Sequence, residues 1–364
     1  MRIPLVILAL LPGVFTSLQA QSWQSEFGFQ SGYTRVKPAG TGASDHIDVF
    51  SIPAFNLPGI LPAGASLFAI IPWKKRIAIE TSVGLLQGPA PLIGDGTFFD
   101  LGLRANYAIT PKLYAAAGGR LNWLESGGLS ETQLGVQAAF GYRFGFIAGL
   151  RGRIEANVSF LGNSEFLAPA NTYGLEFGVS KQLGGRARAA APARGARAWQ
   201  PALGLQGGYT RAHAVGGGGD VTSLAFPGLG GGATILGSPA GPPVLFAILP
   251  VGKKLAIEPG LDINRLQSQG QTLFGANATA RLNYAVSGGW YAAAGGNLVY
   301  VKVTGADAEN ITGANVAWGY RFPLAAGLGG RFEVNYTMMG KNDDVGLPAI
   351  NTLGLQLAAT MPLR

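Results

Sequence analysis

The chain has 364 residues and a formal net charge of +8, and charged residues make up 13% of it, about half the share of an ordinary soluble domain. It contains no cysteine and two histidines. This excludes disulfide scaffolds, thiol catalysis and cysteine-ligated zinc, and leaves little for a histidine-rich metal site. No apolar run of about 20 residues follows the N-terminus, which argues against membrane-spanning helices. Because the basic residues form no face with interleaved aromatics, we expect no nucleic-acid partner. We also expect no metal and no cofactor.

The first twenty residues have the pattern of an export signal. Arg2 is followed by the apolar run 3–11, and small residues lead up to Ala20. A charged start, a short apolar middle and a small-residue end are typical of a secretory signal peptide, and this run is too short to span a bilayer. We therefore predict a signal peptide over 1–20 and export from the cytoplasm.

The rest of the chain repeats itself. The motif GYTR at 32–35 recurs at 208–211, YAAAGG at 114–119 recurs at 291–296, and GYRF at 141–144 recurs at 319–322. The copies lie about 177 residues apart and keep their order, which indicates two domain-sized repeats rather than a solenoid. We predict a first β-barrel repeat over 21–184, a linker rich in Arg, Ala and Pro over 185–199, and a second β-barrel repeat over 200–364.

Within each repeat, apolar residues alternate with polar or small ones. In the stretch 99–109, for example, Phe99, Leu101 and Leu103 fall on one face of a strand, and Asp100 and Arg104 fall on the other. The first repeat then has eight expected strands: 24–36, 66–73, 75–87, 97–109, 112–124, 131–144, 146–160 and 171–183. Tight turns alternate with longer loops, and we assign 45–54 to the first long loop because a ninth strand would spoil that alternation.

The lengths and ends of these strands favour a membrane barrel with its apolar face outward. Strands of about 9–13 residues fit a tilted bilayer crossing, and Tyr107, Trp123 and Tyr142 stand at strand ends, where interfacial aromatic girdles belong. With this pattern the sequence resembles the eight-stranded outer-membrane barrels of the OmpA, OmpX and opacity-protein type, over a whole repeat and twice along the chain. The resemblance implies an all-β, antiparallel up-and-down transmembrane β-barrel in a Gram-negative outer membrane, in contact with its lipids and with the barrel-assembly machinery.

Two architectures are compatible with the strand count. Two tandem eight-stranded barrels fit the short turns, the long linker and the small residues on the polar face. One sixteen-stranded barrel, the size of a porin, would enclose a water-filled lumen. We expect the two tandem barrels, with the sixteen-stranded barrel as the alternative.

Charged residues recur at corresponding positions on the polar face of both repeats. They are Glu80, Arg104, Arg143, Arg153 and Glu155 in the first repeat, and Glu258, Arg281, Arg321, Arg331 and Glu333 in the second. A buried charge must be paired to be tolerated, so we expect these residues to form a structural ion-pair network in the lumen. Their functional alternative is a selectivity or proton-linked site.

Other candidates are weaker. Asp45, His46 and Asp48 could bind a metal or supply a base, but we expect exposed loop residues. His213 does not align with His46, and the glycine runs 216–219 and 228–232 lack the Lys-Ser/Thr of a phosphate-binding loop. We predict no catalytic residues.

The expected function is a non-enzymatic outer-membrane barrel with a structural, adhesive or envelope-anchoring role, whose long loops are free to meet a surface ligand. The alternative is a porin-like channel formed by one sixteen-stranded barrel. Two further alternatives are a lipid-modifying outer-membrane enzyme, which would lose activity on His46→Ala, and a soluble exported binder.

Overall fold

The computed structural model describes residues 23–38, 46–52, 67–90, 94–146, 149–164, 169–183, 198–215, 220–226, 244–268, 270–324, 327–341 and 349–363. The predicted signal peptide lies outside these residues, as do Asp45, the two glycine runs and all but the last two residues of the predicted linker.

The described chain is all β-structure, with antiparallel strands that form a barrel, as the alternation predicted. The first half contains β1 (Glu26–Pro38), β2 (Ile47–Ile52), β3 (Leu67–Lys74), β4 (Ile77–Ala90), β5 (Gly94–Ala108), β6 (Leu113–Ser126), β7 (Leu129–Gly145), β8 (Arg151–Leu161) and β9 (Ala170–Gln182). The second half contains β10 (Ala202–Ala214), β11 (Val221–Phe226), β12 (Leu245–Pro250), β13 (Leu255–Ser268), β14 (Gln271–Ser287), β15 (Trp290–Val303), β16 (Glu309–Pro323), β17 (Gly329–Met339) and β18 (Ile350–Pro362).

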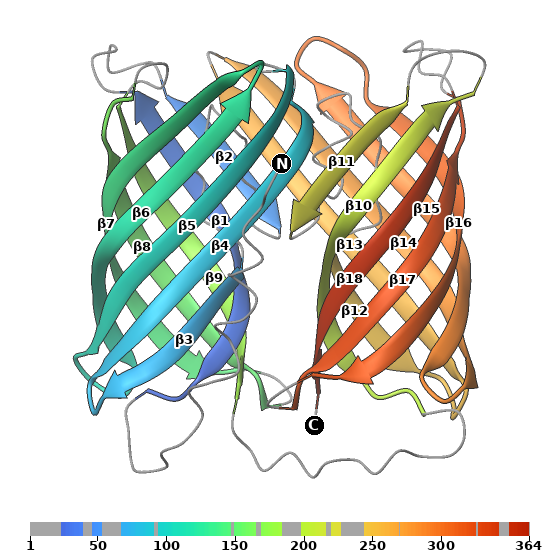
Figure 1. The fold of residues 1–364 in the computed structure, drawn as a ribbon, viewed down its shortest axis with the longest axis horizontal. Coiled ribbons are helices and arrows are strands. Elements are labelled where there is room, and N and C mark those ends of the chain that lie inside the picture. The colour runs from blue at the N-terminus through green and yellow to red at the C-terminus, as the bar shows by residue number, and fades with distance from the viewer. Residues whose placement is uncertain are drawn as a thin grey trace.

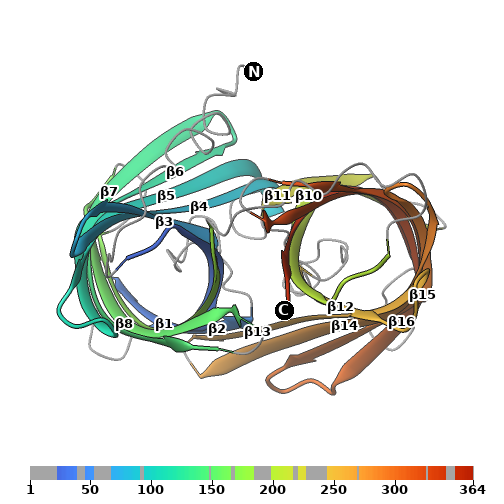
Figure 2. The same ribbon diagram turned by 90° about the horizontal axis from the view of Figure 1, so that it is seen from below.

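At the end of the molecule that carries the tight turns, each half closes on itself. The start of β1 pairs with β3 on one side and β9 on the other, and β3 to β9 pair in chain order. We call these strands the first narrow ring. In the same way β10 pairs with β12 and β18, and β12 to β18 complete the second narrow ring. Figure 2 shows the two rings side by side.

At the opposite end the two halves share one wall. There β2 lies between β1 and β13, and β11 lies between β10 and β4. Phe50 of β2 pairs with Arg265 of β13, and Leu224 of β11 pairs with Gln87 of β4. At this end the strand pairing therefore forms one closed ring that includes every strand except β3 and β12. This wide ring has sixteen strands. Figure 1 shows the halves apart below and joined above.

The assignment of 45–54 to a loop is wrong, because Ile47–Ile52 forms β2. The reason lies in β3, which covers the edge of β1 only from Glu26 to Phe29. The remaining edge, Gly32 to Val36, pairs with β2 instead. An unpaired strand edge is not tolerated inside a bilayer, so the short strand satisfies backbone groups that β3 leaves open.

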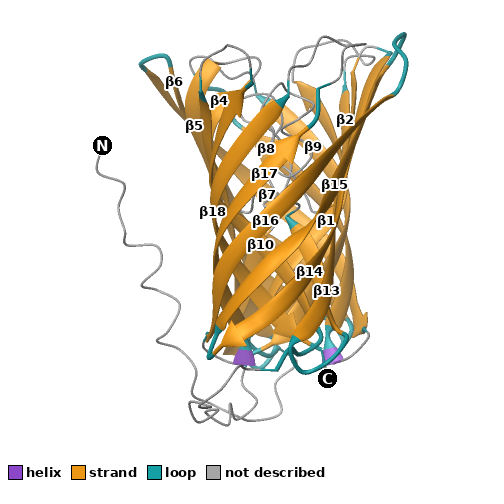
Figure 3. Cartoon of the chain, turned by 90° about the vertical axis from the view of Figure 1, so that its right-hand side faces the viewer, coloured by secondary structure: helices purple, strands orange, loops and turns teal. Residues whose placement is uncertain are grey.

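The wall is apolar outside and polar inside. Leu134, Val136 and Leu175 are about 60% exposed on the outer face, whereas Glu80 and Arg153 on the inner face are buried. This is the reverse of a soluble barrel and the arrangement of an outer-membrane β-barrel. Figure 3 shows the strands crossing the molecule at a steep tilt, as closure of such a barrel requires. No helix among the described residues is long and apolar enough to cross a membrane.

Between the two narrow rings, outward-facing apolar side chains pack against each other. Phe29 and Val179 from the first half and Leu205 and Met361 from the second form one buried cluster. Lys181 Nζ also donates to the carbonyl oxygen of Pro362 at 2.5 Å. Because lipid tails are as apolar as these side chains, close van der Waals packing and this hydrogen bond, rather than exclusion of water, favour keeping the rings together.

Candidate functional site

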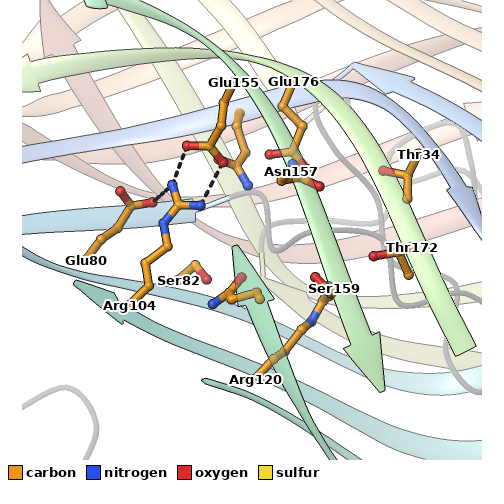
Figure 4. A pocket seen from close by; sticks show the side chains of 12 residues that line it. Thr34, Glu80, Ser82, Arg104, Arg120, Glu155, Asn157, Ser159, Thr172 and Glu176 are labelled. Carbon is orange, nitrogen blue, oxygen red and sulfur yellow. Dashed lines mark hydrogen bonds and ion pairs between the residues drawn. The ribbon is translucent and has the colours of Figure 1, made fainter. Parts of the chain in front are cut away.

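The inside of the first narrow ring is crossed by a buried ion-pair cluster, built around Arg104 of β5. Its Nη1 donates to Glu155 Oε1 at 2.7 Å, and its Nη2 donates to Glu155 Oε2 at 2.6 Å and to Glu80 Oε1 at 2.9 Å (Figure 4). The bidentate contact to Glu155 is the stronger class of charge-assisted hydrogen bond. One guanidinium thus links β4, β5 and β8 across the lumen.

Neutral side chains and a second arginine complete this first cluster. Arg153 Nη1 and Nη2 donate to Glu80 Oε2 and Oε1 at 2.8 and 3.0 Å, and Arg153 also donates to Gln30. Tyr114 Oη donates to Glu155 Oε2 at 2.6 Å. The Arg153 guanidinium lies 3.6 Å from the centroid of the Phe68 ring, a position that favours a desolvated cation. Both carboxylates are therefore paired with arginine, which buried charges require.

The second narrow ring contains the same arrangement. Arg281 donates to Glu333 at 2.7 Å through each Nη atom and to Glu258 Oε1 at 2.8 Å through Nε. Arg331 Nη1 donates to Glu258 Oε2 at 2.6 Å, and Tyr291 Oη donates to Glu333 Oε2 at 2.6 Å. The correspondence includes Tyr114 and Tyr291, which were not among the predicted site residues. The two rings therefore pair their buried charges through the same set of contacts.

The structure brings eight of the ten predicted site residues together in these two clusters. The other two, Arg143 and Arg321, have other partners: Arg143 forms an ion pair with Glu26, and Arg321 donates to the carbonyl oxygen of Ala198. Arg143 pairs in register with Arg153 on the neighbouring strand, and like charges directly opposite each other repel. Its Nη1 lies 3.9 Å from Glu26 Oε1, and its Nη2 donates to the carbonyl oxygen of Pro111 at 3.1 Å.

A tryptophan that precedes the first strand of each half closes the turn end of each ring. The Arg143 guanidinium stacks 3.8 Å from the Trp23 ring centroid, and Arg321 lies at the same distance from Trp199. Trp23 is 1% exposed, and its Nε1 donates to the carbonyl oxygen of Arg76 at 3.1 Å. Neither tryptophan was among the predicted site residues, although each stands nine residues before a GYTR motif, and this repeated spacing could have identified them.

Beyond the first cluster lies a polar cavity of about 30 Å³, lined by residues that include Thr34, Arg120, Asn157 and Glu176 (Figure 4). A volume of about 10–15 Å³ open to water centres holds one water molecule, so this cavity holds about two. The corresponding cavity of the second ring is about 10 Å³ and is lined by Asn297, Asn315 and Asn335 among others.

The two lumens differ in charge beyond the shared clusters. In the first, Arg120 Nε donates to Asp100 Oδ1 at 2.8 Å. The residues 177 positions later are Asn277 and Asn297, both neutral and buried. At these two positions the first lumen therefore carries an ion pair where the second carries two amides.

The two histidines each lie beside an aspartate near the wide end. His46 Nε2 is 3.5 Å from Asp48 Oδ2, and His213 Nδ1 is 2.9 Å from Asp220 Oδ1. The Arg211 guanidinium, followed by His213, holds the pKa of Asp220 below its usual range. Among the described residues, no group of three or more His, Cys, Asp or Glu side chains could hold a metal ion.

No protein-family model and no curated protein matches the chain. Among solved structures, it is similar to a bacterial polysaccharide outer membrane secretin at 6% identity, covering 96% of this chain and 100% of that one, with a TM-score of 0.32. It is also similar to the CymD monoaromatic hydrocarbon channel, at 9% identity over 96% and 94% of the two chains with a TM-score of 0.30. A third is the COG4313 outer membrane channel from Pseudomonas putida F1, at 13% identity over 96% and 99% with a TM-score of 0.26.

Likenesses at this level carry no conclusion about what this chain transports or binds. The wall itself defines the class of protein. Its apolar outer face, its buried charges inside and its closed strand pairing are those of an outer-membrane β-barrel.

Proposed function

We propose that the chain is an outer-membrane channel in which one wide ring divides into two narrow lumens. The observation that carries this proposal is the sixteen-strand pairing at one end of the wall. Sixteen strands are the number at which barrels enclose an aqueous channel, whereas eight leave room for little more than side chains. Water and small polar solutes would enter through the wide ring and meet the constriction of each narrow ring.

The constrictions make this a restricted channel rather than an open pore. In the first lumen a solute has to pass the cluster around Arg104 and then the Trp23–Arg143 stack. Separating one partner from a buried ion pair costs about 3–5 kcal/mol. Since each 1.4 kcal/mol is a factor of ten, an open lumen would be populated roughly 10²- to 10⁴-fold less than a closed one. The proposal therefore predicts small or rare conductance steps.

A second candidate function is a non-enzymatic structural, adhesive or envelope-anchoring role. The filled interiors of both narrow rings favour it, because a lumen that never opens needs only to be stable. In either case we propose outer-membrane lipids as the environment of the apolar face and the barrel-assembly machinery as a partner. A surface ligand would then meet the chain through its long loops.

The test is single-channel conductance of the refolded full-length protein in a planar bilayer. The informative variant is Trp23→Ala with Trp199→Ala, which removes both aromatic closures and leaves the ion-pair clusters in place. The matched control is Trp73→Ala, since Trp73 is 63% exposed on the outside. A channel should show larger or more frequent steps in the double variant and unchanged behaviour in the control. If the double variant inserts and stays silent, and it is still silent after Arg104→Met with Glu155→Gln is added to remove the ion pair of the first lumen, the structural role is the better account.

A further inference from the structure

Glu176 of β9 is a buried carboxylate without an ionic partner. It is 5% exposed, and its Oε2 atom has no hydrogen-bond partner among the described residues. Asn157 hydrogen-bonds the carboxylate, but no arginine in the described chain forms an ion pair with it. A buried carboxylate without a cation beside it is costly unless another group neutralises its charge.

The neighbouring carboxylate makes the position less favourable still. Glu155 of β8 pairs in register with Glu176, so their Cβ atoms lie about 4.5–5.5 Å apart on one face of the sheet. Glu155 is already bound by Arg104 and Tyr114. Two carboxylates thus face the same space, and the available countercharge is committed to one of them.

The second half has a neutral residue at the corresponding position. Gln356 pairs in register with Glu333 as Glu176 does with Glu155. Its Nε2 donates to Thr210 Oγ1 at 3.4 Å. An amide therefore fits this place in the barrel, and the carboxylate of the first half adds a negative charge that the packing of the wall does not require.

The carboxylate borders the polar cavity of about 30 Å³ in the first lumen (Figure 4). Neutral oxygen-bearing side chains line the same cavity, including Thr34, Asn157, Ser159 and Thr172. Of the other charged groups in the lining, Arg104 is bound to Glu80 and Glu155, and Arg120 is bound to Asp100. In this lining the Glu176 carboxylate is therefore the charged group that the ion pairs do not neutralise.

We propose that the first lumen binds one small monovalent cation, of the size of Na⁺, at Glu176. Hard cations take carboxylate, hydroxyl, amide and water oxygens as ligands, and the cavity has room for an ion with about one water. A single uncompensated negative charge balances one positive charge. A divalent ion would leave an excess of positive charge beside the Arg104 and Arg120 guanidinium groups.

The test measures the apparent melting temperature of the refolded full-length protein in detergent, at pH 8 and about 0.15 M ionic strength. NaCl is compared with N-methyl-D-glucamine chloride, whose cation is too large for the cavity. A ligand that binds only the folded state raises stability by mass action, so Na⁺ should raise the wild-type melting temperature by about 2–4 °C relative to the organic cation. Glu176→Gln, which copies the second half, should remove this difference.

The reciprocal variant Gln356→Glu places the same charge in the second lumen. It should lower the melting temperature in both salts, because the second cavity of about 10 Å³ is too small for an ion with a water and Gln356 is not part of its lining. The proposal is overturned if the wild type melts at the same temperature in both salts. It is also overturned if acidification alone stabilises the wild type to the level of Glu176→Gln with no effect of Na⁺, because a proton then occupies the site. Since melting is measured, the result does not depend on whether the protein conducts.

Discussion

The ion-pair cluster of the first narrow ring makes a quantitative prediction about stability. In Arg104→Met, Glu155 loses two hydrogen bonds of 2.7 and 2.6 Å and retains that from Tyr114. Glu80 keeps both bonds from Arg153. The change therefore leaves one buried carboxylate without a cation, and removal of one partner from a buried pair costs about 3–5 kcal/mol.

Urea unfolding in lipid vesicles, followed by tryptophan fluorescence, measures this loss. Arg281→Met is the matched variant in the second ring. Its cost should fall at the lower end of the range, because Arg331 Nε remains 3.8 Å from Glu333 Oε2. The double variant Arg104→Met with Glu155→Gln should recover much of the loss, since neither charge is then left buried alone.

A loss below about 1 kcal/mol for Arg104→Met, the value of an exposed ion pair, would refute this reasoning. It would mean that water reaches Glu155 freely in the folded barrel. A double variant as unstable as the single one would show that the cost comes from packing of the long side chain rather than from the orphaned charge.

Two further predictions concern the tyrosine that supports this cluster. Tyr114→Phe removes the donor at 2.6 Å from Glu155 Oε2, and because a hydrogen bond to a charged group contributes about 1.5–3 kcal/mol, urea unfolding should show a loss of that size. In Gly141→Ala the added Cβ would lie 2.3 Å from the Tyr114 ring, so the same assay should show a loss of about 1–3 kcal/mol from overpacking. Gly145→Ala, whose Cβ would meet nothing within 4 Å, is the control and should be neutral, and equal losses at both glycines would contradict the steric explanation.

The wall and much of the lumen could be predicted because both depend on local pattern. Period-two alternation identified the strands, and it placed Glu80 and Arg104 on the same inward face. Once two strands pair in register, residues of the same parity meet across the lumen. Pairing of buried charges then follows from the cost of leaving them alone. The internal duplication stays a prediction from motif spacing.

The joining of the two halves could not be predicted in this way. The strand β2 has six residues, and its partner β13 lies more than 200 positions further along the chain. Nothing in a short alternating segment specifies which distant edge it covers. The partner of Arg143 could not be predicted for a related reason, because parity gives the face of a side chain but not the direction in which it turns along the lumen. There, repulsion by Arg153 and the ring of Trp23 decide the direction.

The most direct test of the shared wall is a cross-link between the halves. The natural chain has no cysteine, so paired substitutions report on one contact at a time. Phe50 and Arg265 pair directly across β2 and β13, and directly opposed Cα atoms in antiparallel strands lie about 4.5–5.5 Å apart, within disulfide range. The control pairs Phe50 with Gln87, which the structure pairs with Leu224 instead.

After mild oxidation of the folded protein, mobility on a non-reducing gel reports the cross-link. The account predicts a disulfide in the variant Phe50→Cys with Arg265→Cys and none in Phe50→Cys with Gln87→Cys. The reverse result, a disulfide only in the second variant, would show that β2 pairs with β4 of its own half. The two halves would then be separate barrels without a common sixteen-strand wall.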